Sequence, residues 1–160
     1  MPLFIQPDYD NFNTVWTLNY NKEISEFVSC SPDETKRIAI EIVSNLSIPN
    51  AIYLNGVLGS GKTLFCKSIA EYFGFPDLNS SSFSRVSHFS GAINLVHCDF
   101  YRGIPSSMFF EEEVEPLLNK EWIILIEWGD PCMWDFQCKS FELNIEISCN
   151  QNRVFRFNEI

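Results

Sequence analysis

Residues 56–63 read Gly56-Val57-Leu58-Gly59-Ser60-Gly61-Lys62-Thr63. This is the pattern G-x-x-x-x-G-K-[ST], in which a loop with few bulky side chains turns its backbone N–H groups inward at the positive end of a helix. A short apolar run, residues 51–55, precedes it, and Phe65, Ile69 and Phe73 follow at a spacing of four. We therefore predict a buried strand, a phosphate-binding loop and a helix, in that order.

The residues before this loop predict another strand and a capped helix. Residues 24–30 are the candidate strand. Ser31 is the expected N-cap, Pro32 stands at the first helical position, and Glu34 can reach back to the N–H of the cap. Apolar side chains then recur on one helical face, at Ile38, Ile42, Val43 and Leu46. This stripe is expected to pack on the core.

The residues after the loop complete an α/β pattern. Residues 78–87 are rich in serine and are expected to be irregular, whereas residues 93–96 and 122–126 are apolar strands. A weaker helical stretch carries Glu111-Glu112-Glu113, and residues 141–157 alternate around a turn, as in a hairpin. The expected architecture is a P-loop NTPase fold, with a mostly parallel central sheet flanked by helices and an antiparallel C-terminal hairpin.

Length and composition favour one folded domain over residues 1–160, in which residues 1–21 form an arm or an edge strand. Hydrophobic residues are 46% and charged residues 20% of the chain, which is the balance of a globular protein. The formal net charge is −10 and the pI is about 4.5. This charge disfavours direct, tight binding to the backbone of a nucleic acid.

Cysteine usage and the chain start indicate a soluble cytoplasmic protein. The six cysteines are scattered without a C-x-x-C pair, and His88 and His97 complete no zinc pattern. We expect reduced, structural thiols. Residues 1–10 lack the features of a signal peptide, and no stretch is long enough to span a bilayer.

Two acids occupy positions where a nucleotide site would need them. Lys62 offers a charge to the β and γ phosphates of ATP, and the Thr63 hydroxyl is placed to ligate Mg²⁺. Asp99 and Glu127 follow apolar strands, and parallel strands end at the same edge of a sheet. Asp99 is assigned to magnesium, and Glu127 to magnesium or to positioning the attacking water.

Two other features have plainer interpretations. The acidic run at residues 111–115 is expected to be a solvated helix face rather than a metal site. Trp128 directly follows Glu127, and both a packing role and a functional role stay open for it.

Over roughly residues 24–157 the pattern resembles the TsaE (YjeE) family of bacterial ATPases. The family's S-x-x-E-T segment is matched at residues 31–35, and its H-x-D-x-Y-R is intact at residues 97–102. Ser80-Ser81-Ser82-Phe83 is the candidate for S-P-T-[FY], and residues 126–130 match I-E-W-x-E with Asp130 in the final position. Val57 replaces an acid of the family's loop, and Ser81 replaces a proline.

The resemblance implies a Mg²⁺-dependent ATPase for threonylcarbamoyladenosine modification of tRNA. It would be slow alone and would act on TsaB- and TsaD-like partner proteins, meeting tRNA only through them. The residues implied in catalysis are Glu127, Lys62 and Ser82, and those in metal binding are Thr63, Asp99 and Glu127. The residues implied in nucleotide binding are Gly56, Leu58, Gly59, Ser60, Gly61, Lys62, Thr63, Leu64, Thr35 and Trp128.

Two alternatives remain at this point. A small-molecule kinase would usually bring several arginines to the phosphates through a lid, but the chain has only 11 lysines and arginines, and none is clustered between Gly103 and the C-terminal hairpin. A nucleotide-gated binding module without catalysis would use the same site to order a docking surface.

Overall fold

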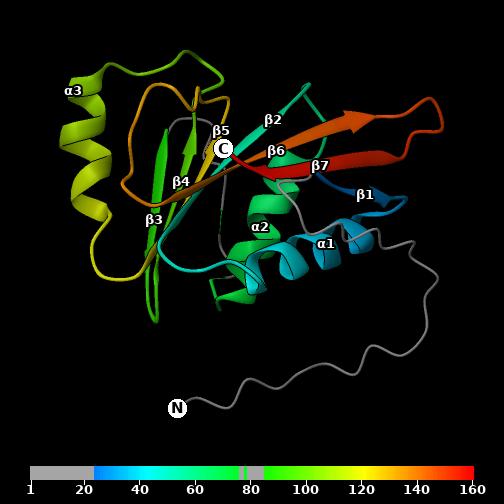
Figure 1. Ribbon diagram of the computed structural model, residues 1–160, viewed down its shortest axis with the longest axis horizontal. Helices are drawn as coiled ribbons and strands as arrows, with labels where there is room; N and C mark the ends of the chain where they lie inside the picture. The colour runs from blue at the N-terminus through cyan, green and yellow to red at the C-terminus, as the bar shows by residue number, and fades with distance from the viewer. Residues whose placement is uncertain (1–23, 76–77, 79–84) are drawn as a thin grey trace.

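A seven-stranded sheet organises the chain (Figure 1). The computed structural model describes residues 24–75, 78 and 85–160, so that the predicted arm at residues 1–21 and the predicted site residue Ser82 lie outside the described residues. In spatial order the strands are β1 (Ser25–Ser29), β7 (Arg153–Glu159), β6 (Lys139–Ile147), β2 (Asn50–Gly56), β5 (Trp122–Glu127), β4 (Asn94–Asp99) and β3 (Val86–Ser90).

The centre of the sheet is parallel. Strands β6, β2, β5 and β4 run in one direction, while β7, β1 and β3 add antiparallel pairings at the two sides. This confirms the predicted parallel core and the antiparallel hairpin of β6 and β7. Since β2, β4 and β5 share a direction, the loop after β2 and the acids that end β4 and β5 lie at one edge.

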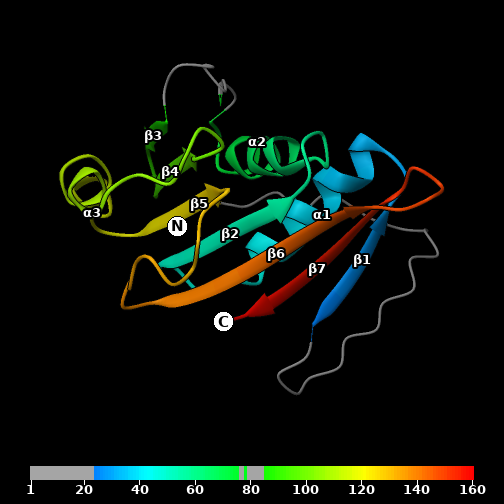
Figure 2. The ribbon, with the colours of Figure 1, turned by 90° about the horizontal axis from the view of Figure 1, so that it is seen from above.

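Two helices cover one face of the sheet (Figure 2). Helices α1 (Pro32–Ser44) and α2 (Lys62–Tyr72) pack on the alternate side chains of the central strands, such as Ile52, Leu54 and Leu125. The other face holds Tyr53, Ile124 and their neighbours. It is covered by a helical segment and by aromatic side chains that follow β5, so the sheet is buried on both faces.

Helix α1 is capped by Ser31 as predicted, but the Glu34 carboxylate reaches the residue before the cap. Ser31 Oγ accepts the Glu34 N–H at 3.2 Å, as predicted. Glu34 Oε2, however, accepts the N–H of Cys30 at 2.6 Å, and not that of the cap residue. Leu46 of the predicted stripe lies beyond the C-terminus of the helix, where it packs partly buried on the core.

The prediction of irregular structure was wrong at residues 86 and 87. They begin β3, in which Val86 pairs with Cys98 and Ser90 with Asn94. The segment is short and polar, so its extended form depends on hydrogen bonds from β4 rather than on a hydrophobic period of its own.

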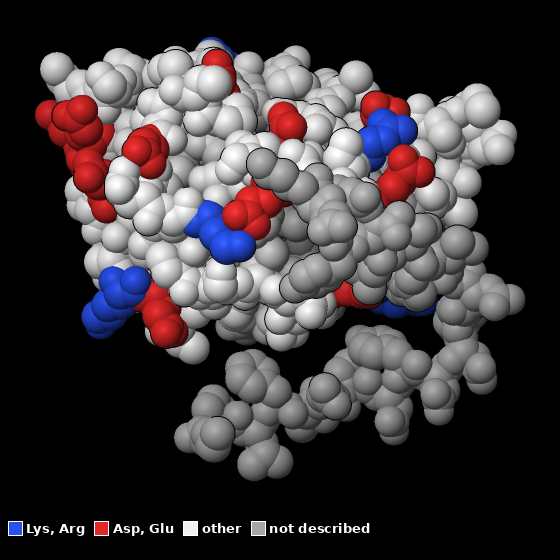
Figure 3. All heavy atoms as spheres, viewed as in Figure 1, with Lys and Arg blue, Asp and Glu red and all other residues white. Residues whose placement is uncertain are grey.

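The acidic helical stretch is present and faces solvent. It is one continuous segment made of α3 (Ser107–Phe109), a π-helical turn (Phe110–Val114) and a 3₁₀ turn (Glu115–Leu117). Phe110 and Val114 are buried, whereas the three glutamates between them are exposed. Figure 3 shows acidic side chains gathered over this segment, as a solvated helix face would have them. Within the described ranges no helix is long and apolar enough to cross a membrane.

Candidate functional site

The loop between β2 and α2 owes its shape to three glycines with positive φ. Gly59 and Gly61 have φ of 77° and 112°, and an added Cβ at either would meet no atom within 4 Å. Gly56 has φ of 146°, and a Cβ there would lie 2.4 Å from the carbonyl oxygen of Ile145 in β6. The loop is therefore fixed against the sheet at its start and open at Gly59 and Gly61, as a phosphate cradle requires.

A cleft of about 240 Å³ opens beside this loop. The structure brings together nine of the predicted site residues around it: Leu58, Gly59, Gly61, Lys62, Thr63, Leu64, Asp99, Glu127 and Trp128. Tyr101, which the sequence analysis did not select, lines it too. Gly56 and Ser60 belong to the loop without lining the cleft. Thr35 lies in the first turn of α1, where its hydroxyl hydrogen-bonds that of Ser29 at 2.9 Å.

Lys62 lies folded into the loop. Its ammonium donates to the carbonyl oxygens of Gly56 at 2.7 Å and Val57 at 3.0 Å, and it lies 3.9 Å from the centroid of the Trp128 ring. Burial lowers the pKa of this lysine, and the negative charges of Glu127 and Asp99 act in the opposite direction. The positive charge thus sits at the cleft wall, near both acids.

Glu127 is the centre of the site and is 2% exposed. Its Oε2 accepts a hydrogen bond from the Thr63 hydroxyl at 3.1 Å. Its Oε1 lies 2.9 Å from Nε2 of His97, which is also buried. A buried carboxylate is tolerated when its oxygens are hydrogen-bonded, so these two partners fix the position of the acid.

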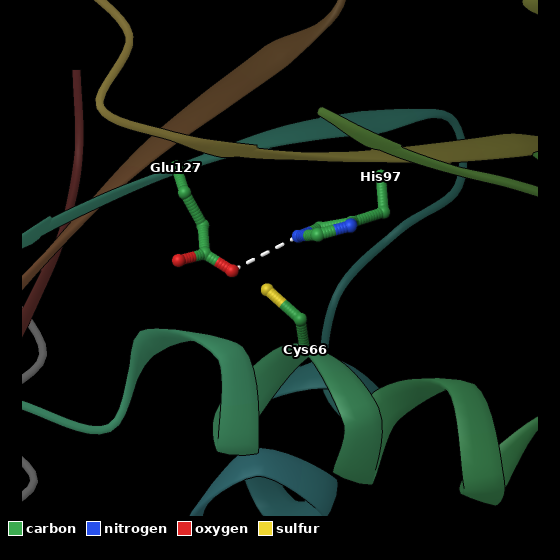
Figure 4. A group of neighbouring side chains, drawn as sticks. All are labelled: Cys66, His97 and Glu127. Atoms are coloured by element: carbon green, nitrogen blue, oxygen red, sulfur yellow. Dashed lines mark hydrogen bonds and ion pairs between the residues drawn. The ribbon is translucent and has the colours of Figure 1, made fainter. Parts of the chain in front are cut away.

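Cys66 completes the surroundings of Glu127. It lies on α2, one turn after Lys62, and is fully buried. Burial, followed by the charge and the hydrogen bond of Glu127, raises the pKa of its thiol well above the usual range. Figure 4 shows the side chains of Cys66, His97 and Glu127 pointing toward one another.

Asp99 supplies the second acid. It ends β4 directly opposite Glu127 in the register of β4 and β5. Its Oδ1 accepts the N–H of Tyr101 at 3.0 Å. With the Thr63 hydroxyl, the two carboxylates form a set of hard oxygen donors, which suits Mg²⁺. The residues present therefore fit a nucleotide phosphate chain with its magnesium ion.

Trp128 lines the cleft and also packs on the core, so the packing interpretation is confirmed and the functional one stays a prediction. Its φ is 62°, which is unusual for a bulky residue, and its N–H donates to the Leu54 carbonyl at 3.4 Å. The ring contacts the Lys62 ammonium and the Tyr101 ring, with 5.2 Å between the ring centroids. It also packs against the core on the second face of the sheet.

Two residues beside Glu127 had no assigned role in the sequence analysis. His97 stands two positions before Asp99, and strand alternation places such residues on the same face. This spacing could have identified His97 as a neighbour of the site. Cys66 stands three residues after Thr63, so both share a side of α2. No feature of the sequence shows that this side meets His97.

Comparison with known proteins agrees with the fold and the motifs. The family model described as "Threonylcarbamoyl adenosine biosynthesis protein TsaE" matches residues 29–155. The chain is similar to "tRNA threonylcarbamoyladenosine biosynthesis protein TsaE" of Rickettsia bellii, at 29% identity over 81% of this chain and 92% of the relative. The chain is also similar to the protein of that name in Rickettsia typhi, at 32% identity over 78% of this chain and 88% of the relative.

A relative that matches a shorter part of the chain and a solved structure extend the comparison. The protein of the same name in Bacillus subtilis is 33% identical over 62% of this chain and 63% of its own. A crystal structure of Bacillus subtilis YdiB superimposes with a TM-score of 0.66 over 89% of both chains, at 23% identity. This likeness shows the fold.

Replacing His97 should test whether it holds Glu127. His97→Leu leaves Oε1 of a buried carboxylate without its imidazole partner, so we expect the free energy of unfolding to fall by about 1–3 kcal/mol. His97→Gln keeps an N–H donor and should lose less. Urea denaturation measures both, and His88→Leu, at an exposed position of β3, is the matched control. Equal losses at His97 and His88 would contradict the assignment.

Proposed function

The chain belongs to the TsaE family of threonylcarbamoyl adenosine biosynthesis proteins, and from this we propose that it is the subunit that binds and hydrolyses ATP for this modification of tRNA. The observation that carries the proposal is the pairing of Thr63 with Glu127 beside the glycine loop. It supports a site in which a phosphate cradle and the acids for its metal ion share one edge of the sheet.

The loop and the start of α2 would hold the phosphates. The backbone between Leu58 and Thr63 lies at the N-terminus of an 11-residue helix, which is its positive end and favours an anion. Lys62 adds a full positive charge at the cleft wall. The Lys62 ammonium already donates to two carbonyl oxygens of the loop. A bound phosphate oxygen would replace these acceptors, which lie in the same loop.

The oxygen donors at the sheet edge would hold magnesium. Thr63 and Asp99 are the proposed ligands, and Glu127 either joins them or orients the attacking water. Bound Mg²⁺ supplies charge neutralisation for the leaving phosphate. His97 fixes one oxygen of Glu127 and Thr63 the other, so the carboxylate keeps one orientation while the phosphates are bound.

The proposed partners are TsaB- and TsaD-like proteins, and tRNA is reached through them. The net charge of −10 supports this division, since it would repel an RNA backbone. We place the activity in the cytoplasm. All six cysteines lie in the described part of the chain and are free thiols, as a reducing compartment allows.

Lys62→Ala should weaken ATP binding. Loss of a charged hydrogen bond to phosphate of about 1.5–3 kcal/mol corresponds to a rise in Kd of roughly ten- to a hundredfold. Isothermal calorimetry with ATP and Mg²⁺ measures the change. Lys67→Ala, on the same helix but outside the cleft, should leave Kd within about twofold. An unaltered affinity in Lys62→Ala would overturn the phosphate assignment.

Asp99→Asn should raise the magnesium concentration needed for turnover. The amide keeps the size of the side chain but removes the charge that a hard cation prefers, so the midpoint of a Mg²⁺ titration of ATP hydrolysis should shift up by roughly tenfold or more. Asp135→Asn changes an exposed acid away from the cleft and should leave the midpoint in place. A shared midpoint for both variants would show that Asp99 does not bind the ion.

Reconstitution tests the function as a whole. ATP hydrolysis is measured for the chain alone, then with TsaB- and TsaD-like proteins and tRNA, and the modified nucleoside is measured by mass spectrometry. We expect slow hydrolysis that the partners raise, and modification that is lost with Lys62→Ala. ADP release that requires a small-molecule acceptor would identify a kinase instead. Modification that survives Glu127→Ala, with partner binding kept, would identify a non-catalytic nucleotide-gated module.

A further inference from the structure

Three side chains of the types that bind metal ions meet beside the cleft. Cys66 comes from α2, His97 from β4 and Glu127 from β5, and each is buried. One ligand atom from each, the sulfur, a ring nitrogen and a carboxylate oxygen, lies within 4.8 Å of the other two. Figure 4 shows them converging from the helix and the two strands on one small volume.

The donor set is chemically different from the one proposed for magnesium. A thiolate, an imidazole and a carboxylate are ligands of Zn²⁺, whereas Mg²⁺ takes oxygen donors and binds sulfur poorly. Thr63, Asp99 and Glu127 make the oxygen set, and Cys66, His97 and Glu127 make the mixed set. Glu127 is the member that both sets share.

We propose that Cys66, His97 and Glu127 form a second metal site, selective for Zn²⁺, and that zinc bound there inhibits ATP hydrolysis by withdrawing Glu127 from the nucleotide site. The inhibition rests on the proposed ATPase function. The metal site itself does not, because it is defined by the three side chains alone.

Zinc binding at this cluster releases one proton to solvent. The Cys66 S–H bond breaks, its proton leaves to solvent, and the sulfur binds the ion as a thiolate. Next to the ionised carboxylate of Glu127, Nε2 of His97 is the donor, so zinc binding also requires the imidazole proton to move from Nε2 to Nδ1, which frees the Nε2 lone pair for the ion. The metal replaces the short contact between Nε2 and Glu127 Oε1. Three protein ligands leave the fourth tetrahedral position open.

The position of the cluster explains how zinc would reach it and how zinc would affect Glu127. Glu127 lines the cleft, so an ion can reach its carboxylate from there, and Cys66 and His97 lie directly behind it. Zinc would bind Oε1 in place of its present hydrogen bond with His97 and would draw the carboxylate toward Cys66 on α2. Thr63 donates to the other oxygen of the same carboxylate, so the magnesium position would be disturbed at the same time.

Cys98, in the same strand as His97, provides a matched control for Cys66. It is as deeply buried as Cys66 and is adjacent to His97 in sequence. It packs in the hydrophobic cluster on the opposite face of the sheet, and it is not part of the metal-binding group. Cys98→Ser therefore removes a buried thiol without removing a ligand.

Cobalt substitution tests the site without nucleotide. Co²⁺ is titrated into the full chain, and the thiolate-to-cobalt charge-transfer absorption in the near ultraviolet is followed. We expect one equivalent to produce the band in the unmodified chain and in Cys98→Ser, and Zn²⁺ to displace it. Cys66→Ser should lose the band. His97→Gln, which keeps a donor for Glu127, should weaken Co²⁺ binding by about tenfold or more.

Folding and adventitious binding are controlled in the same experiment. Circular dichroism and thermal melts establish whether each variant is folded. If Cys66→Ser does not fold, the loss of Co²⁺ affinity in His97→Gln decides whether the site exists. The exposed thiols of Cys30, Cys132 and Cys149 are present in every variant, so only a difference between variants counts. An equal band in the unmodified chain and in Cys66→Ser, or no band in the unmodified chain, would overturn the site.

The inhibitory role has a separate readout. Zn²⁺ should slow ATP hydrolysis in the unmodified chain and in Cys98→Ser, and the ratio of rates with and without zinc should return toward one in Cys66→Ser. Equal zinc inhibition of Cys66→Ser would overturn this role. Absence of hydrolysis without zinc, even with the partner proteins, would count against the ATPase, and the cobalt spectra would still judge the metal site.

Discussion

The structure of the site depends on one buried carboxylate. Glu127 is almost inaccessible to water, and a charge in such a place is stable only when its oxygens are occupied. Thr63 occupies one oxygen and His97 the other, with the Cys66 thiol against the same group. These partners come from α2 and β4, so the helix that carries Lys62 is tied to two neighbouring strands through a single side chain.

The parallel sheet makes this arrangement geometrically available. Strands β2, β4 and β5 end at one edge, and Leu54 and Asp99 both lie beside Glu127 in the register. The loop leaves that edge under a second constraint, because Gly56 packs against the Ile145 carbonyl of β6 too closely for any side chain. The loop cannot shift relative to the strands without losing this contact, and Gly59 and Gly61 line the same cleft as the two acids.

Much of this arrangement can be read from the sequence, because the decisive patterns are local. The glycine loop, the apolar strands before Glu127 and Asp99, and the alternation of the last hairpin each lie within a few residues. Strand β3 was missed because it is short and polar, and its structure comes from β4. No zinc-ligand spacing is visible in the sequence, for a related reason. Cys66, His97 and Glu127 are about thirty residues apart from one to the next, and they meet only once strand order and the rotation of α2 are known.

A carboxylate shared by two donor sets would make the two metals compete. Zinc needs Glu127 as a ligand, and the magnesium site uses it as a ligand or to orient the attacking water. Its Oε1 and Oε2 face different neighbours, an imidazole on one side and a hydroxyl on the other. The hydroxyl side leads to Asp99 and the cleft, where a hard, hydrated cation can keep its water ligands. The imidazole side is buried and contains sulfur, which favours a softer ion. In this proposal the orientation of one side chain decides which ion the site can hold.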